Sequence, residues 1–328
     1  MSYTQLSASE RLTLYQYRTA DHLTMTEIAA KMERSKSTIS RELKRNSMDG
    51  GLYLPDTAQS KMRTRRQQAK QRFMTISAST IEEVKQRLEQ YHSPEQLAGQ
   101  MKRQGIGQIS HETIYLMIYR NHQGLGSYQQ YLRQGQKQRR RRKGVHQKRG
   151  GIPGRVGIEH RPAIADQKIE MGHWESDTVI GANHTGILVT HVDKASKFLL
   201  AGLAKNKTVQ QINQVTIELF GQIGTAFRKT MTFDNGKEFS GHQKLTEALG
   251  VSCYFANPYH SWERGLNEHT NGLLRQFFPK GTNFKIVKPE TLKHAVDLIN
   301  HRPRKSLDYR TPYEVLYSQP SAPVALQI

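Results

Sequence analysis

The stretch GHWESDTVI at residues 172–180 decides the fold class of the second half of the chain. Trp174, Thr178, Val179 and Ile180 are residue types that favour strands, and together they predict a strand buried in a sheet. Asp177 lies inside this strand. A carboxylate in a buried strand is costly unless it is paired with a cation or bound to a metal. The position of Asp177 therefore indicates a functional site as well as a strand.

Segments of the same kind follow Asp177 and alternate with helical ones. Strands are predicted at 186–193, 197–203, 229–234 and 251–256, and a helix at about 208–223. Alternation of strands and helices is typical of an α/β domain. We place the boundaries of this domain at residues 166–322.

Two further acids have distinctive surroundings. Asp234 ends the strand 229–234, directly before the turn Asn235-Gly236, and functional sites gather at strand ends in α/β domains. Glu268 lies in a predicted helix that continues to about Phe278.

This last helix has two different sides at about 100° per residue. Its apolar side is formed by Leu266, Leu273 and Phe277. Its opposite side carries Glu268, Asn271, Gly272 and Arg275. Glu268 is thus presented away from the core, beside an amide and a guanidinium, which are suitable neighbours for a metal-bound phosphodiester.

Three carboxylates, those of Asp177, Asp234 and Glu268, are the ligand set of a two-metal site for in-line phosphoryl displacement. Oxygen ligands favour Mg²⁺ or Mn²⁺, and we expect two ions per active site. Taken singly, Asp234 can be a turn residue and Glu268 a solvated helix residue. Their joint order favours the metal site, with 33 residues between Asp234 and Glu268. Glu175 is either an auxiliary ligand or a structural partner, and Asp193 is expected to be structural.

Residues 24–46 predict two helices joined by a tight turn, which is a helix-turn-helix pattern. Ile28 packs in the first helix, Ser35 begins the second, and Ile39 and Leu43 form the buried face of the second. Glu33 occupies the turn position where glycine is usual.

The second of these helices has an outward face that suits DNA, with hydroxyls and a guanidinium for base edges and later cations for phosphates. Its predicted DNA-contacting residues are Lys36, Ser37, Thr38, Ser40, Arg41, Lys44 and Arg45. Capping boxes at Ser7, Thr24, Thr80 and Ser93 predict further helix starts. The helix that starts at Ser93 belongs to a second helix-turn-helix-like unit, which either binds DNA or is a structural or dimerising bundle.

The chain has 328 residues and a formal net charge of +21, which favours a polyanionic partner such as nucleic acid over a metabolic substrate. A ribosomal or merely basic protein is the alternative. Lys and Arg are concentrated at 61–72 and 133–149, which we interpret as linkers. The run Arg139, Arg140, Arg141 and Arg142 is predicted to contact phosphates. The single cysteine, Cys253, excludes a Cys/His zinc module and a disulfide framework.

The predicted organisation has two all-α helix-turn-helix units followed by the α/β domain. It consists of a helix-turn-helix domain at 1–48, a basic linker at 49–75, a second helix-turn-helix-like domain at 76–125, a basic linker at 126–165 and the α/β domain at 166–322. No apolar run is long enough to span a membrane, so we expect a soluble protein of the cytoplasm.

Several strings resemble the transposases of the insertion sequence thirty family, which carry a retroviral-integrase-type catalytic domain. They are HWESD at 173–177, FDNGKEF at 233–239, NGLLRQFFPKG at 271–281, NHRPRK at 300–305 and STISREL at 37–43. The resemblance covers nearly the whole chain. The chain departs from the family pattern at Ser176, where glycine is frequent, and at Glu33.

The resemblance implies an RNase H-like fold for the α/β domain and a DDE triad formed by Asp177, Asp234 and Glu268. It implies Mg²⁺-dependent 3′-end cleavage and strand transfer at the terminal inverted repeats of an insertion sequence. The expected partners are double-stranded DNA, both repeat and target, and further copies of the chain in a dimer or larger assembly on paired ends. No membrane and no small-molecule cofactor are expected, and the protein is expected at the bacterial nucleoid. Asn271, Arg275 and Lys280 are predicted DNA contacts.

Two other classes of function remain open. One is a non-enzymatic DNA-binding regulator whose α/β domain only dimerises, and an intact set of three acids argues against it. The other is a structure-directed nuclease without a joining step. Two N-terminal helical DNA-binding units argue against it, because they indicate binding to fixed DNA sequences.

Overall fold

The computed structural model describes residues 5–70, 76–133, 152–258 and 260–318. The chain divides into two compact units, Met1–Ala78 and Ser79–Ile328. No helix in the described residues is long and apolar enough to cross a membrane.

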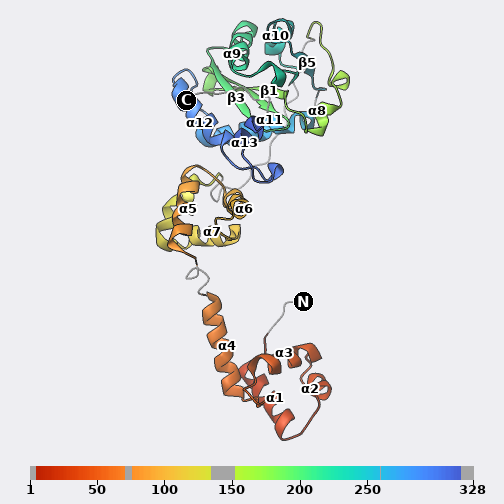
Figure 1. Cartoon of the computed structure of the whole chain (residues 1–328), viewed down its shortest axis with the longest axis vertical. Coiled ribbons are helices and arrows are strands. Elements are labelled where there is room, and N and C mark those ends of the chain that lie inside the picture. The colour runs from red at the N-terminus through yellow and green to blue at the C-terminus, as the bar shows by residue number, and fades with distance from the viewer. Residues whose placement is uncertain (1–4, 71–75, 134–151, 259, 319–328) are drawn as a thin grey trace. The chain divides into compact units, whose positions relative to one another are not determined.

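The first unit is a group of four helices, in which α1, α2 and α3 gather at one end of the longer α4 (Figure 1). These are α1 (Ala8–Thr19), α2 (Met25–Lys31), α3 (Lys36–Asn46) and α4 (Pro55–Lys70). Full capping boxes at Ser7 and Thr24 confirm two predicted helix starts. Ile28, Ile39 and Leu43 are buried together, as the helical spacing predicted.

Helix α4 corrects the prediction that residues 49–75 are a linker. Residues 55–70 are helical, and α4 contacts both α1 and α3. Tyr53 and Ala58 are buried in the same core as α1 and α3, so this end of the segment is held by apolar packing. The density of cations misled the prediction, because a helix needs only one apolar strip to pack and leaves the rest of its surface to charged residues.

The second unit begins with a helical group: α5 (Ala78–Glu89), α6 (Pro94–Gln104), α7 (His111–Tyr119) and the 3₁₀ segment η1 (His122–Tyr131). The capping box at Ser93, with Pro94 at the first helical position, is confirmed. Thr80 was wrongly predicted to precede a helix, since α5 already begins at Ala78. Ile114 and Ile118 are buried as predicted.

A five-stranded sheet forms the rest of the second unit, in the order β3-β2-β1-β4-β5. Its strands are β1 (His173–Ile180), β2 (Ile187–Asp193), β3 (Leu199–Ala204), β4 (Thr230–Phe233) and β5 (Ser252–Phe255). Strands β1, β2 and β3 pair antiparallel, while β4 is parallel to both β1 and β5. All five were predicted to within two residues at each end.

Helices cover both faces of the sheet (Figure 1). Helices α9 (Val209–Gly221) and α10 (His242–Leu249) lie on one side, and α11 (Gly265–Phe277) and α12 (Pro289–Asn300) on the other. Each side has its own apolar cluster, one around Trp174 and one around Leu273. Trp174 is fully buried and donates from Nε1 to the Phe227 carbonyl over 2.8 Å, which fixes the start of β1.

The α/β domain starts earlier than residue 166, where the predicted boundary lay. Ile152 belongs to the apolar cluster around Trp174, and the Phe255 amide donates to the Val156 carbonyl over 2.9 Å. The predicted linker at 126–165 is therefore wrong for its last part, because 152–165 pack on the sheet edge at β5. The remaining elements are α8 (Ile164–Gln167), α13 (Pro312–Tyr317) and the short turns η2 (Ile158–His160), η3 (Ala182–His184), η4 (Thr225–Phe227), η5 (Lys237–Phe239), η6 (Ser261–Arg264) and η7 (Lys305–Leu307).

Candidate active site and DNA-contact surface

Helix α3 presents a polar face to solvent. Its start is capped by Ser35, whose hydroxyl accepts from the Thr38 amide. The predicted contact residues Lys36, Ser37, Ser40, Arg41, Lys44 and Arg45 are exposed, and Thr38 is half-buried. No carboxylate interrupts this exposed set, so α3 offers hydroxyls near its start and cations along its length. Such a face matches the donors that a recognition helix brings to a major groove.

An ion pair that the sequence did not reveal anchors α3 from behind. Arg11 on α1 is 1% exposed, and its Nε lies 2.7 Å from the carboxylate of Glu42 on α3. The Tyr53 hydroxyl donates to the same carboxylate over 3.2 Å. A buried arginine bound in this way holds α3 in one orientation against α1, which keeps the exposed face in place.

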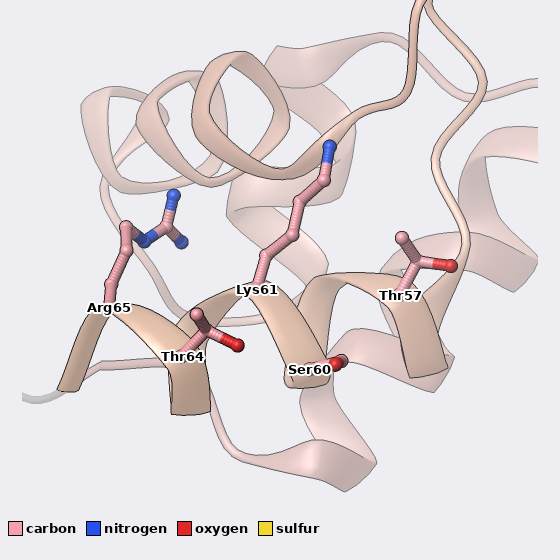
Figure 2. A pocket seen from close by; sticks show the side chains of 5 residues that line it. All are labelled: Thr57, Ser60, Lys61, Thr64 and Arg65. Carbon is pink, nitrogen blue, oxygen red and sulfur yellow. The ribbon is translucent and has the colours of Figure 1, made fainter. Parts of the chain in front are cut away.

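Helix α4 caps the end of α3. Lys61 Nζ donates to the Ser47 carbonyl over 2.8 Å, and Arg65 Nη1 donates to the Arg45 carbonyl over 2.9 Å. Figure 2 shows both side chains extending from α4 toward the same side, above a hollow that Thr57, Ser60 and Thr64 also line. Cations at the last carbonyls of a helix are favourable, since that end carries partial negative charge.

Asp177 and Asp234 come together at the centre of the sheet. Asp177 lies in β1, Asp234 directly follows β4, and these two strands are parallel neighbours. Arg264, the residue before α11, lies between them. Its guanidinium is 3.3 Å from the Asp177 carboxylate and 3.8 Å from that of Asp234, and it donates to the Ser176 carbonyl over 2.6 Å. The two aspartates therefore share one cation.

Opposing influences act on the carboxylate of Asp177. Burial raises the pKa of Asp177, the Arg264 guanidinium opposes that rise, and the neighbouring Asp234 adds to it. Asp234 also accepts from the Gly236 amide over 2.9 Å, so the turn that follows β4 orients its carboxylate. The sequence predicted the two acids but not Arg264, because no periodic pattern links residues that are so far apart along the chain.

Glu268 lies on α11, one turn beyond Arg264, and is exposed. Leu273 is buried in the core and Asn271 faces Asp177, as the helical wheel predicted, whereas Gly272 faces the side chain of Arg133. Asn271 Nδ2 donates to Asp177 over 2.9 Å. Within the described residues, no three His, Cys, Asp or Glu side chains lie close enough to hold one metal ion. The structure thus brings two of the three predicted acids together and places the third on the helix that contacts them.

Glu175 and Asp193 both have internal partners. Glu175 is 3% exposed and accepts from the Asn267 amide over 3.1 Å, and burial raises its pKa. Asp193 is fully buried and accepts from the amides of Gly172 and Ser196. These contacts favour the structural interpretation of Glu175 and confirm that of Asp193.

The other predicted DNA contacts have mixed surroundings. Arg275 donates to the carbonyls of Phe278 and Ile180, so it closes the end of α11 onto β1. Lys280 is exposed just beyond α11. The run Arg139, Arg140, Arg141 and Arg142 lies outside the described residues.

Two parts of the chain match known protein families. Residues 2–46 match the family model of a helix-turn-helix domain, and residues 167–261 match that of the integrase core domain. Among solved structures, the catalytic core domain of BIV integrase is 21% identical with a TM-score of 0.36, over 44% of this chain and 92% of that chain.

The sequence relatives extend over most of the chain. The transposase for insertion sequence element IS4351 of Bacteroides fragilis is 38% identical over 85% of this chain and 85% of the relative. The transposase for IS1086 of Cupriavidus metallidurans is 33% identical over 96% of this chain and 94% of the relative. The transposase for IS30A of Escherichia coli is 33% identical over 88% of this chain and 77% of the relative. The expected fold class, a helix-turn-helix front followed by an integrase core, is confirmed. The chain therefore belongs to the IS30 family of insertion-sequence transposases, and its function is DNA transposition.

Proposed function

We propose that Asp177, Asp234 and Glu268 hold divalent metal ions, Mg²⁺ or Mn²⁺, and form the centre that cuts the 3′ ends of the element and joins them to target DNA. The observation that carries this proposal is the cation shared by Asp177 and Asp234 at neighbouring strands. Two carboxylates that already enclose a guanidinium are hard oxygen donors arranged around a positive charge, which fits such a metal.

The ions would activate the attacking hydroxyl and stabilise the leaving oxygen. The chain's own residues have separate tasks. The neighbouring strands β1 and β4 hold the two aspartates at the sheet centre, and Asn271 orients the Asp177 carboxylate by donating to it over 2.9 Å. Helix α11, which carries Glu268, contacts β1, where Asp177 lies.

At the front of the chain, α3 would read the terminal inverted repeats. Its hydroxyl-bearing start faces base edges, and Lys44 and Arg45 near its end meet the phosphate backbone. Two element ends must be joined in one reaction, so the active species is a dimer or larger assembly on DNA. Sedimentation of the protein on paired-end DNA tests this point, and a strict monomer contradicts it.

The decisive experiment is a cleavage and strand-transfer assay with Mg²⁺ on a labelled duplex that carries the terminal repeat of the element encoding the chain. Asp177→Asn, Asp234→Asn and Glu268→Gln each keep the shape of the side chain and remove its charge. Glu247→Gln, an exposed acid on α10, is the matched control. We expect the first three variants to bind the duplex without cutting or joining it, and the control to do both.

Two results would contradict the proposal. If the duplex is bound but the wild-type protein cuts nothing with either Mg²⁺ or Mn²⁺, the chain is a DNA-binding regulator. If Glu268→Gln retains full activity, the third acid is assigned wrongly and only the aspartate pair stands.

A further inference from the structure

A second cluster of charge lies beside α11, on the face next to the one that carries Glu268. Arg302 and Arg304 follow α12, and Arg133 follows η1. A Cβ atom added to Gly272 of α11 would lie 2.7 Å from Arg133 Nη2, so this guanidinium rests against bare helix backbone. His269 lies one turn earlier on the same face of α11. Burial lowers its pKa most, and the positive charges of all three arginines lower it as well.

The arginines of this cluster lack counter-ions. Within the described residues, none of the three forms an ion pair with a carboxylate. Arg302 is 2% exposed, and its Nε and Nη2 are buried without a hydrogen-bond partner. Its remaining nitrogen, Nη1, donates to the side-chain oxygen of Gln276 over 3.1 Å. Arg304 is 8% exposed and donates to the Ile299 carbonyl over 3.0 Å.

Arg302 thus has the centre of the Phe277 ring 5.9 Å from its guanidinium carbon, but two of its buried donor nitrogens have no acceptor. A buried charge that is neither paired nor fully hydrogen-bonded costs several kcal/mol in general. Burial, together with the charges of neighbouring arginines, lowers the pKa of Arg302 to about 10 and that of Arg304 to about 9. An anion with several acceptor oxygens would supply both the counter-charge and the acceptors.

We propose that Arg133, Arg302 and Arg304 form a phosphate-binding site beside the active centre. The planar fork of a guanidinium matches the oxygens of a phosphate group, and Arg302 has two donor nitrogens to spare. Arg133 is the exposed member of the cluster, so an arriving phosphate meets it first.

The phosphate comes either from the DNA backbone or from free inorganic phosphate. Gly272 and Gln276 of α11 contact the cluster. The residues just before them, Asn271 and Arg275, lie on the active-site side of the helix. One residue corresponds to a rotation of about 100° around the helix axis, so the two faces are adjacent. A DNA strand with one phosphodiester at the acids therefore brings another phosphate toward the cluster. This source rests on the proposed function, whereas binding of inorganic phosphate does not.

The first test is thermal unfolding of the full chain during titration with inorganic phosphate, at constant ionic strength. Arg133→Gln removes the exposed charge without touching the buried pair. Lys293→Gln, an exposed cation on α12, is the matched control. Phosphate stabilises proteins in general by exclusion from their surface, so the quantity that counts is the difference between variants. We expect wild type and Lys293→Gln to gain about 3 °C more than Arg133→Gln at ten times the Kd.

The second test measures the affinity for terminal-repeat DNA against salt concentration. If the DNA backbone supplies the phosphate, the plot of log binding constant against log salt concentration becomes less steep by about one for Arg133→Gln. Its slope stays unchanged for Lys293→Gln. If only the titration distinguishes the variants, the site takes free phosphate.

Equal stabilisation of all three proteins by phosphate, with equal salt slopes, overturns the site. Failure of the proposed function is seen separately, because it removes DNA cleavage while leaving the phosphate titration as it is. Arg304→Gln removes a buried charge of the cluster. We expect this variant to lose the stabilisation by phosphate while its circular dichroism spectrum, which reports whether it is folded, stays as in wild type.

Discussion

The guanidinium of Arg264 lies 3.3 Å from the carboxylate of Asp177, at the place where the proposed function requires a metal ion. A divalent ion bound as proposed would compete with this side chain for the same oxygens and would have to displace it. In the structure, Arg264 offsets the negative charge of the two carboxylates.

Substitution Arg264→Gln is expected to tighten Mn²⁺ binding about tenfold, which corresponds to about 1.4 kcal/mol. The reason is that the competing charge is removed while a hydrogen-bonding side chain remains. Isothermal titration in the absence of DNA measures this directly. Arg264→Lys keeps a positive charge and serves as the control, with affinity close to wild type. Unchanged Mn²⁺ affinity in Arg264→Gln would show that the arginine does not occupy the metal position.

Glu33 gives a prediction about stability. This residue adopts a φ of 52°, in the left-handed region that favours glycine, at the turn between α2 and α3. Such a backbone costs a non-glycine residue about 1–2 kcal/mol, and the flexibility of glycine in the unfolded chain returns about 0.5–1 kcal/mol. Glu33→Gly is therefore expected to stabilise α2 and α3 by about 0.5–1 kcal/mol, measured by amide hydrogen exchange.

The control for this prediction is Glu33→Ala, which removes the charge and keeps the Cβ atom. It is expected to leave exchange in α2 and α3 nearly unchanged. If both variants protect these helices equally, the loss of the carboxylate is responsible and not the backbone conformation.

Arg65 tests the contact between α4 and α3. Its donation to the Arg45 carbonyl satisfies an acceptor at the end of α3, and it also donates to the side chain of Asn46. Arg65→Ala is expected to destabilise the first unit by about 1 kcal/mol, as loss of a charged hydrogen bond at a helix end does. Urea unfolding, monitored by hydrogen exchange in α3, measures the change.

The neighbouring Arg66 is exposed, and Arg66→Ala is the matched control, expected to change stability by less than about 0.5 kcal/mol. Equal effects of the two substitutions would mean that general charge on α4 matters, and not the cap on α3.

The strands and the acids were predictable, and the contacts between distant residues were not. Segments rich in strand-favouring residues predicted all five strands, and the helical wheel of α11 separated Leu273 from Glu268, because both signals are local. A wheel does not measure distances across the fold, so the position of Arg264 between two aspartates had no local signal. The burial of Arg11 was missed for the same reason, since its partner Glu42 lies on another helix.

The linker prediction for residues 49–75 was wrong for a different reason. The cations of α4 suggested a chain segment too charged to pack, whereas Tyr53 and Ala58 at one end supply the apolar contact that it needs. Composition over a window averages the two faces of a helix and hides such a strip.

Gly99 tests how the helical group of the second unit meets the sheet domain. A Cβ atom added at Gly99 of α6 would clash with the ring of Tyr309. Alanine favours a helix over glycine by about 1 kcal/mol, so Gly99→Ala stabilises α6 itself while it pushes Tyr309 away. We expect faster amide exchange around η7 and α13, together with slower exchange inside α6.

Gly107→Ala is the matched control, because its Cβ atom would have only ordinary contacts, the nearest at 3.7 Å to Met101. It is expected to leave exchange around η7 unchanged. The ion pair between Lys305 and Glu95, with a separation of 2.8 Å, spans the same contact and is exposed, so it adds little on its own. If Gly99→Ala leaves exchange around η7 and α13 as in wild type, α6 is not packed against Tyr309 in solution. The contact between α6 and Tyr309 then does not hold the helical group, and with it Arg133, against the sheet domain.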